Sequence, residues 1–237
     1  MARRTRLYQP GPYPSEGEIL ELDSEGSHHL GRVLRFQKGW NLELFDNSGA
    51  QYGATYLGLQ GGRAQVRLGE VSWPKVELPY KVRLALSLVK GERFDWAVEK
   101  LTELGVEEIV PLEAEFAQVK GPARPKVERW QRLAQSAAQQ SGRVIVPTVA
   151  TPQTLEGLLE EWRGGGPLIF FVPEAEPWRP QPAAGESWGL FIGPEGGFSE
   201  AEVAAARRAG AQFYSLGARI LRVETAALAA VVPLALS

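Results

Sequence analysis

Residues 191–199 read Phe-Ile-Gly-Pro-Glu-Gly-Gly-Phe-Ser, and this stretch decides the fold class of the chain. It follows an apolar run at residues 188–192 that predicts a buried strand. It ends at Ser199, which forms a capping box with Glu202 and predicts a helix to about Ala209. In an open α/β sheet, ligands bind beyond the carboxyl ends of the strands, and glycine lets the backbone approach a ligand closely. The stretch therefore predicts either a small-molecule site or, without a ligand, a tight turn between strand and helix. It has neither the Gly-Lys-Ser/Thr ending of a P-loop nor the Gly-x-Gly-x-x-Gly spacing of a dinucleotide site.

Around this stretch the chain alternates between strand-like and helix-like patterns, which indicates a parallel α/β sheet over residues 80–237. Strands are predicted at residues 82–89, 108–112, 167–172, 188–192 and 212–216, with an extended segment at 144–149. Helices are predicted at residues 92–104, at 125–141, from an N-cap at Thr151, and from Glu224 to about Leu236. The last helix is apolar on every side, so we expect it to be buried, in the core of the domain or in a homodimer interface.

The first 73 residues follow a different pattern. Short strand-like runs at residues 41–45 and 64–68 are separated by turn signals, which favours a small β-barrel. Pro74 and Pro79 interrupt the pattern, so residues 74–79 are predicted to be a linker.

Composition excludes several kinds of site. The 237 residues include no cysteine and only two histidines, His28 and His29, so disulfides, thiolate zinc sites and cysteine nucleophiles are excluded and no metal site is expected. The net charge is −2, so an RNA partner would have to be held by local patches rather than by bulk charge. There is neither an apolar run of membrane length nor a signal-peptide pattern, and we expect a cytoplasmic protein.

A second segment, residues 215–226, reads Ser-Leu-Gly-Ala-Arg-Ile-Leu-Arg-Val-Glu-Thr-Ala. Alone it favours a helix cap with two surface arginines. Together with residues 193–199, it resembles the C-terminal half of the 16S rRNA uridine N3-methyltransferases, a family of the SPOUT superfamily. The resemblance extends to residues 90–92, 100–106, 129–130 and 140–147, and to His-His-Leu-Gly-Arg-Val-Leu-Arg at 28–35.

The resemblance implies a fold and an activity. Residues 1–73 would form a PUA-like β-barrel that binds RNA, residues 74–79 a linker, and residues 80–237 a SPOUT domain with a C-terminal trefoil knot. The implied enzyme is a homodimer that uses S-adenosylmethionine to methylate the N3 atom of a uridine in 16S rRNA of the small ribosomal subunit.

The resemblance also implies site residues. Those expected to bind the cofactor are Phe171, Val172, Ile192, Gly193, Pro194, Glu195, Gly196, Gly197, Leu216, Gly217, Ile220, Leu221, Arg222 and Thr225. Those expected to bind RNA are Arg3, Arg6, His29, Arg32, Arg35, Gln140 and Arg143. For catalysis we expect Arg222 to stabilise the uracil anion and Glu224 to position the base or take its proton, although a helix cap or ion pair is an equal alternative for Glu224.

Two aromatic residues stand out beside these. Phe198, next to the glycines, is a candidate for contact with the target base. Phe116 lies in Ala-Glu-Phe-Ala at residues 114–117, where the family tends to have Thr/Ser-Glu-Arg, so any role of that arginine in binding RNA is absent or falls to another residue such as Arg124.

Three alternatives remain open at the level of sequence. The chain could be an RNA-binding module without catalysis, an enzyme with a different nucleotide cofactor, or a SPOUT enzyme that acts on tRNA. Titration with S-adenosylmethionine separates the first two from the preferred interpretation.

Overall fold

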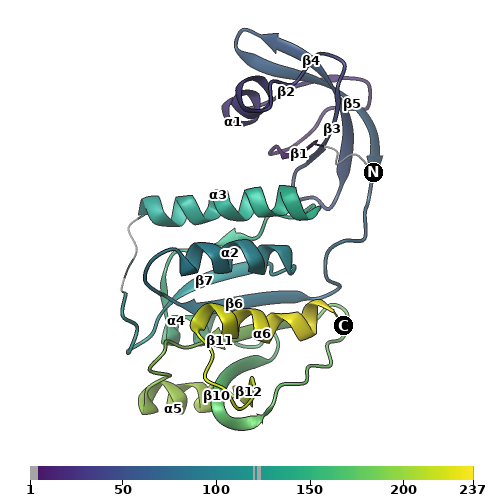
Figure 1. Ribbon diagram of the computed structural model, residues 1–237. Helices are drawn as coiled ribbons and strands as arrows, with labels where there is room; N and C mark the ends of the chain where they lie inside the picture. The colour runs from purple at the N-terminus through teal and green to yellow at the C-terminus, as the bar shows by residue number, and fades with distance from the viewer. Residues whose placement is uncertain (1–4, 120, 122–123, 237) are drawn as a thin grey trace. The chain divides into compact units, whose positions relative to one another are not determined.

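The computed structural model describes residues 5–119, 121 and 124–236 (Figure 1). The chain divides into two compact units. The first comprises residues 1–77 and 138–146, and the second comprises residues 78–137 and 147–237. The first unit therefore includes the end of a helix whose beginning belongs to the second.

The first unit is built on a five-stranded sheet in the order β1-β3-β4-β5-β2. Its strands are β1(Thr5–Tyr8), β2(Ile19–Glu21), β3(Asn41–Phe45), β4(Gln51–Gln60) and β5(Arg63–Ser72). Strands β1 and β3 are parallel and the other pairs are antiparallel. Alternate residues of β3 and β5, such as Leu42, Leu44 and Val66, are buried, as expected for strands with one face on a core. The β-rich character predicted for this region is thus confirmed.

A short helical segment follows β2. Helix α1(Ser24–His28) begins after Asp23, whose carboxylate accepts a hydrogen bond from the Gly26 N–H at 2.7 Å. A π-helical turn, His29–Val33, continues it. Leu30 anchors this turn in the core of the unit, while the residues around it face outward.

The second unit holds a seven-stranded sheet in the order β12-β10-β11-β6-β7-β8, with β9 also paired to β7. Its strands are β6(Lys81–Ser87), β7(Glu108–Glu113), β8(Thr148–Val149), β9(Gln153–Thr154), β10(Leu168–Pro177), β11(Ser187–Ile192) and β12(Gln212–Ser215). All of these pairings are parallel, which confirms the predicted parallel α/β sheet.

The helices of this unit are α2(Arg93–Glu103), α3(Arg124–Ser141), α4(Leu155–Glu161), α5(Glu200–Arg208) and α6(Val223–Ala235). Helix α3 belongs to the unit only in part, and the helices include two pairs in contact, α4 with α5 and α2 with α6. Helices α4 and α5 share a core with Phe170 and Phe191, whose rings stack at 4.4 Å. Helix α2 contacts α6, and α6 contacts β6 and β11. In the described part of the chain, no helix is both long enough and apolar enough to cross a bilayer.

The predicted start of one helix was wrong. Helix α4 begins after Thr154, whose hydroxyl accepts a hydrogen bond from the Gly157 N–H, and not at Thr151. The reason is that Gln153 and Thr154 pair with β7, so their backbone is extended. Helix α6 is buried on one side within a single chain, so the core of the domain accounts for that side of the expected burial. Val232 and Leu236 are exposed, although Ala227, Val231 and Leu234 on the opposite side are buried.

Candidate functional site

Three neighbouring strands of the second unit end at one edge of its sheet. Strands β12, β10 and β11 are adjacent and parallel, so their carboxyl ends point in the same direction. Strand β10 is irregular at this point: both Phe171 and Glu176 pair with Tyr214, so residues 172–175 leave the ladder. The irregular part of β10 and the loops after β11 and β12 therefore converge where ligands bind in open α/β sheets.

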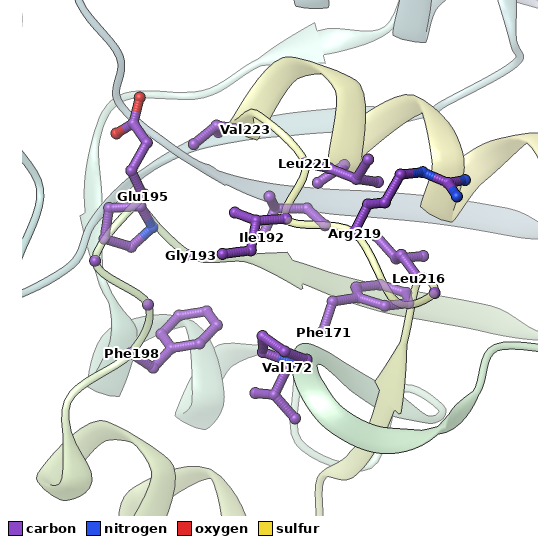
Figure 2. Close-up of a pocket in the computed structure, with 17 residues that line it drawn as sticks. Phe171, Val172, Ile192, Gly193, Glu195, Phe198, Leu216, Arg219, Leu221 and Val223 are labelled. Atoms are coloured by element: carbon purple, nitrogen blue, oxygen red, sulfur yellow. The ribbon is translucent and has the colours of Figure 1, made fainter.

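A cavity of about 320 Å³ lies between these loops (Figure 2). Its volume is at the lower end of the range for small-molecule sites. Most of its lining is apolar side chain and glycine backbone. The lining residues are Phe171, Val172, Pro173, Ile192, Gly193, Pro194, Glu195, Gly196, Gly197, Phe198, Leu216, Gly217, Arg219, Ile220, Leu221, Val223 and Ala226.

The backbone of two glycines is left-handed in this lining. Gly197 has φ of 75° and Gly217 has φ of 108°, in the region that side chains with a Cβ atom rarely adopt. A Cβ atom built on either residue would have no atom within 4 Å. Glycine is therefore required at these two positions by the turn of the backbone and not by a lack of space.

A buried carboxylate fixes the end of the glycine-rich loop. Glu202 accepts a hydrogen bond from the Ser199 N–H at 2.8 Å, and the Ser199 hydroxyl accepts one from the Glu202 N–H at 3.3 Å, which completes the predicted capping box. The other oxygen of Glu202 accepts the Glu115 N–H at 2.9 Å. One side chain thus holds both the start of α5 and the loop after β7.

An arginine connects the glycine-rich loop to the last helix. Arg93 Nη1 lies 3.2 Å from Glu195 Oε1 and 3.8 Å from Glu224 Oε2. In Figure 2 the Glu195 side chain points away from Phe171 and Leu216. Because the Glu224 side chain is only 11% exposed, Arg93 is the cation that compensates its charge among the described residues.

The predicted cofactor residues come together at this cavity with two exceptions. Arg222 and Thr225 do not line it, and both are exposed. Arg222 is the N-cap residue of α6 and is flanked along the chain by Leu221 and Val223, which do line the cavity. Glu224, the second residue predicted for catalysis, lies in the first turn of α6 beside Arg93.

Sequence reasoning missed several lining residues. Phe198 was singled out only for the target base, and Pro173, Arg219, Val223 and Ala226 were not singled out at all. Val223 and Ala226 are three residues apart on α6 and so share a face of the helix. That spacing was not visible from the predicted helix start at Glu224, because Val223 is the first residue of α6.

Some of the predicted RNA-binding residues form an exposed group in the first unit. Arg32 lies in the π-helical turn and Arg35 follows it with φ of 49°, and both are exposed. His29 is half-buried at the start of the same turn. Gln140 is exposed near the end of α3. Arg3 lies outside the described residues.

Two other predicted RNA-binding residues have internal partners. Arg6 donates to Gln51 Oε1 at 2.7 Å and to the Arg143 carbonyl oxygen at 2.8 Å, and burial lowers the pKa of its guanidinium although Glu43 and Glu77 oppose that shift. Arg143 is buried and pairs with Glu77 at 2.8 Å. Both guanidinium groups therefore have partners inside the first unit.

Comparison with known families gives the class of protein. Residues 76–235 match the RNA methyltransferase domain family, and residues 22–69 match the RNA methyltransferase PUA domain family. The first match spans the parallel sheet and the whole cavity lining. The fold and the site are thus those of an RNA methyltransferase domain preceded by a PUA domain.

Individual relatives narrow this class. A ribosomal RNA small subunit methyltransferase E from Synechocystis is 37% identical over 87% of this chain and 69% of its own length, and the one from Bacillus subtilis is 30% identical over 90% and 88%. The chain belongs to the ribosomal RNA small subunit methyltransferase E family.

Solved structures agree with this assignment. The Neisseria gonorrhoeae ribosomal RNA small subunit methyltransferase E bound to S-adenosyl methionine superposes with a TM-score of 0.89, at 32% identity over 97% of this chain and 96% of that one. A Legionella pneumophila protein in complex with the bound cofactor SAM gives a TM-score of 0.89, at 36% identity over 98% and 97%.

Proposed function

We propose that this protein is an S-adenosylmethionine-dependent methyltransferase that modifies the N3 atom of a uridine in 16S rRNA. The observation that carries the proposal is the cavity at the carboxyl ends of β10, β11 and β12, lined by the two segments that resemble the uridine N3-methyltransferases. Two relatives of the same fold have been solved with this cofactor bound.

The chemistry of the lining fits the cofactor. Leu216, Ile220 and Leu221 provide an apolar slot for a flat ring, and the backbone around them provides donors and acceptors. Gly196 and Gly197 leave room for close contact with the backbone of the glycine-rich loop. We assign these five residues, with Phe171 and the rest of the cavity lining, to cofactor binding.

The bound cofactor would supply a methyl group bonded to a sulfonium sulfur, and the sulfur would leave as a neutral thioether when that bond breaks. The protein then has to orient the uracil, exclude water and let N3 lose its proton as the new bond to carbon forms. We assign Arg222 to stabilise the negative charge that develops on the uracil, because its exposed side chain follows directly on the cavity-lining Leu221. We assign Glu224, held beside Arg93, to position that segment of α6 or to accept the proton.

The RNA would be held partly by the first unit. Arg32 and Arg35 are exposed cations close together in the sequence, so they can contact phosphates, which positions a substrate without reading its sequence. We place His29 and Gln140 in the same RNA-binding role. A small-subunit rRNA substrate also implies that the enzyme works in the cytoplasm.

We further propose a SPOUT fold with a trefoil knot and a homodimeric assembly. Exposed apolar residues of the second unit support the dimer: Val232 on α6, Leu236 directly after that helix, and Trp96 on α2, which contacts α6. Exposed apolar side chains can mark interfaces between subunits. Sedimentation of the purified protein tests this assembly directly.

The activity is tested by incubating the protein with S-adenosylmethionine carrying a labelled methyl group and with 16S rRNA, assembled small subunits or tRNA. We expect label in small-subunit RNA alone, with 3-methyluridine identified by mass spectrometry of the digested RNA. Label only in tRNA, or on another atom of the base, would overturn the substrate assignment. If titration calorimetry detected no binding of S-adenosylmethionine, the enzyme assignment itself would fail.

A further inference from the structure

An exposed aromatic side chain stands beside the cavity without forming part of its lining. Phe116, on the loop after β7, is 50% exposed. A Cβ atom built on Gly196 would lie 3.4 Å from the Cβ atom of Phe116 and 3.8 Å from its Cδ2 atom. The Phe116 side chain therefore rests against the glycine-rich loop at the edge of the cavity.

The residues on both sides of Phe116 are held in place. Ala114 and Ala117 are buried, and the Ala117 N–H donates to the Ala114 carbonyl oxygen at 3.1 Å. The Glu115 N–H donates to the buried carboxylate of Glu202 at 2.9 Å. Because these contacts fix the loop on either side, the backbone that carries Phe116 is held in place and the ring is presented from an ordered loop.

The geometry of methylation at N3 indicates what an exposed aromatic ring at Phe116 could contact. The N3 atom lies at the edge of the uracil ring, so the acceptor base must present that edge to the methyl donor, and the nucleotides on either side of it must lie across the mouth of the cavity. Phe198 lines the cavity and Phe116 lies outside the lining. Phe116 is therefore placed for a base that flanks the acceptor, not for the acceptor itself.

We propose that Phe116 is a stacking platform for a nucleobase that flanks the methylated uridine. This inference rests on the proposed function. Stacking on an aromatic ring is a common way to hold a single-stranded base, and it tolerates any base because every base has a π-face. A contact away from the reacting atoms is made equally in the ground state and in the transition state, so it lowers the KM for RNA and leaves kcat unchanged.

The test compares Phe116→Ala, Phe116→Leu and Phe116→Trp in methyl transfer to small subunits isolated without the modification. We expect KM for the subunits to rise about tenfold in the Ala and Leu variants, with kcat within about twofold of the parent, because one stacked base is lost. The Trp variant should keep the parental KM. The Kd for S-adenosylmethionine, measured by calorimetry, should be the same in all of them.

Several outcomes would overturn the inference. Full activity in the Leu variant would mean that apolar packing suffices and no base is stacked. A raised Kd for S-adenosylmethionine would make Phe116 a support for the glycine-rich loop. A change in sedimentation would make it a subunit contact. Trp73→Ala, which removes an exposed aromatic residue of the first unit, is the control for a general effect of surface aromatics.

If the unsubstituted protein transferred no methyl group, the proposed function would be refuted, but the stacking platform would not. In that case the affinity of each variant for 16S rRNA, measured by filter binding, still tests the platform. A tenfold weaker affinity in the Ala and Leu variants supports it, and equal affinity overturns it.

Discussion

Replacing Glu202 with alanine should destabilise the protein and weaken cofactor binding together. The substitution removes the acceptor for two backbone N–H groups, those of Ser199 and Glu115. A hydrogen bond to a charged group contributes about 1.5–3 kcal/mol, and an unsatisfied buried donor costs about 1–3 kcal/mol. Ser199 is buried, whereas water can reach the loop of Glu115, so we expect a total loss of roughly 3 kcal/mol.

This loss can be measured by calorimetric unfolding and by titration with S-adenosylmethionine. For a protein of this size, 3 kcal/mol lowers Tm by roughly 6–12 °C. If about a tenth of the folded molecules keep the glycine-rich loop in its present conformation, the Kd for the cofactor rises about tenfold. The matched control is Glu200→Ala, because Glu200 is an exposed carboxylate in the same first turn of α5. It should cost only about 0.3–1 kcal/mol through the helix dipole.

Equal effects of the two substitutions would refute the reasoning, because only Glu202 has the buried hydrogen bonds. If the Glu202→Ala protein were destabilised but its Kd for S-adenosylmethionine were unchanged, the capping box would stabilise the fold without affecting cofactor binding. The glycine-rich loop would then be held by other contacts.

Four further predictions concern the site and the RNA surface. Arg222→Ala should lower kcat about 100-fold without changing the Kd for S-adenosylmethionine, and near-parental turnover in a methyl-transfer assay would remove Arg222 from the mechanism. Arg93→Gln should raise that Kd by a few-fold and destabilise the fold by about 1–3 kcal/mol, because Glu224 loses its compensating charge; equal denaturation midpoints would contradict this. Gly197→Ala should cost about 1–2 kcal/mol from its left-handed backbone alone, and a crystal structure should show no displaced neighbour. Joint replacement of Arg32 and Arg35 by glutamine should weaken RNA binding and reduce the slope of log affinity against log salt by about 2; an unchanged slope would exclude both residues from phosphate contact.

The local elements and the site segments could be predicted from the residue order. Apolar runs and their period predicted β6, β7, β11 and β12 to within a few residues, because buried strands and amphipathic helices leave local patterns. The Ser199 capping box was visible because both of its partners lie within four residues. The glycine-rich segments also supplied nearly all of the cavity lining, since loops at strand ends are where an α/β sheet binds its ligands.

The tertiary structure decided which of these segments meet. No local pattern shows that β10 lies between β11 and β12, yet that order brings the three loops together. Pairing with β7 moved the start of α4 to Thr154, and the link from Arg93 to Glu195 and Glu224 joins residues about 100 and 130 positions apart. The internal partners of Arg6 and Arg143 likewise come from distant parts of the chain. The hydrophobic period indicates whether a residue faces a core. Which residue it contacts across that core depends on packing between elements that are far apart in the sequence, so it is known only from the folded structure.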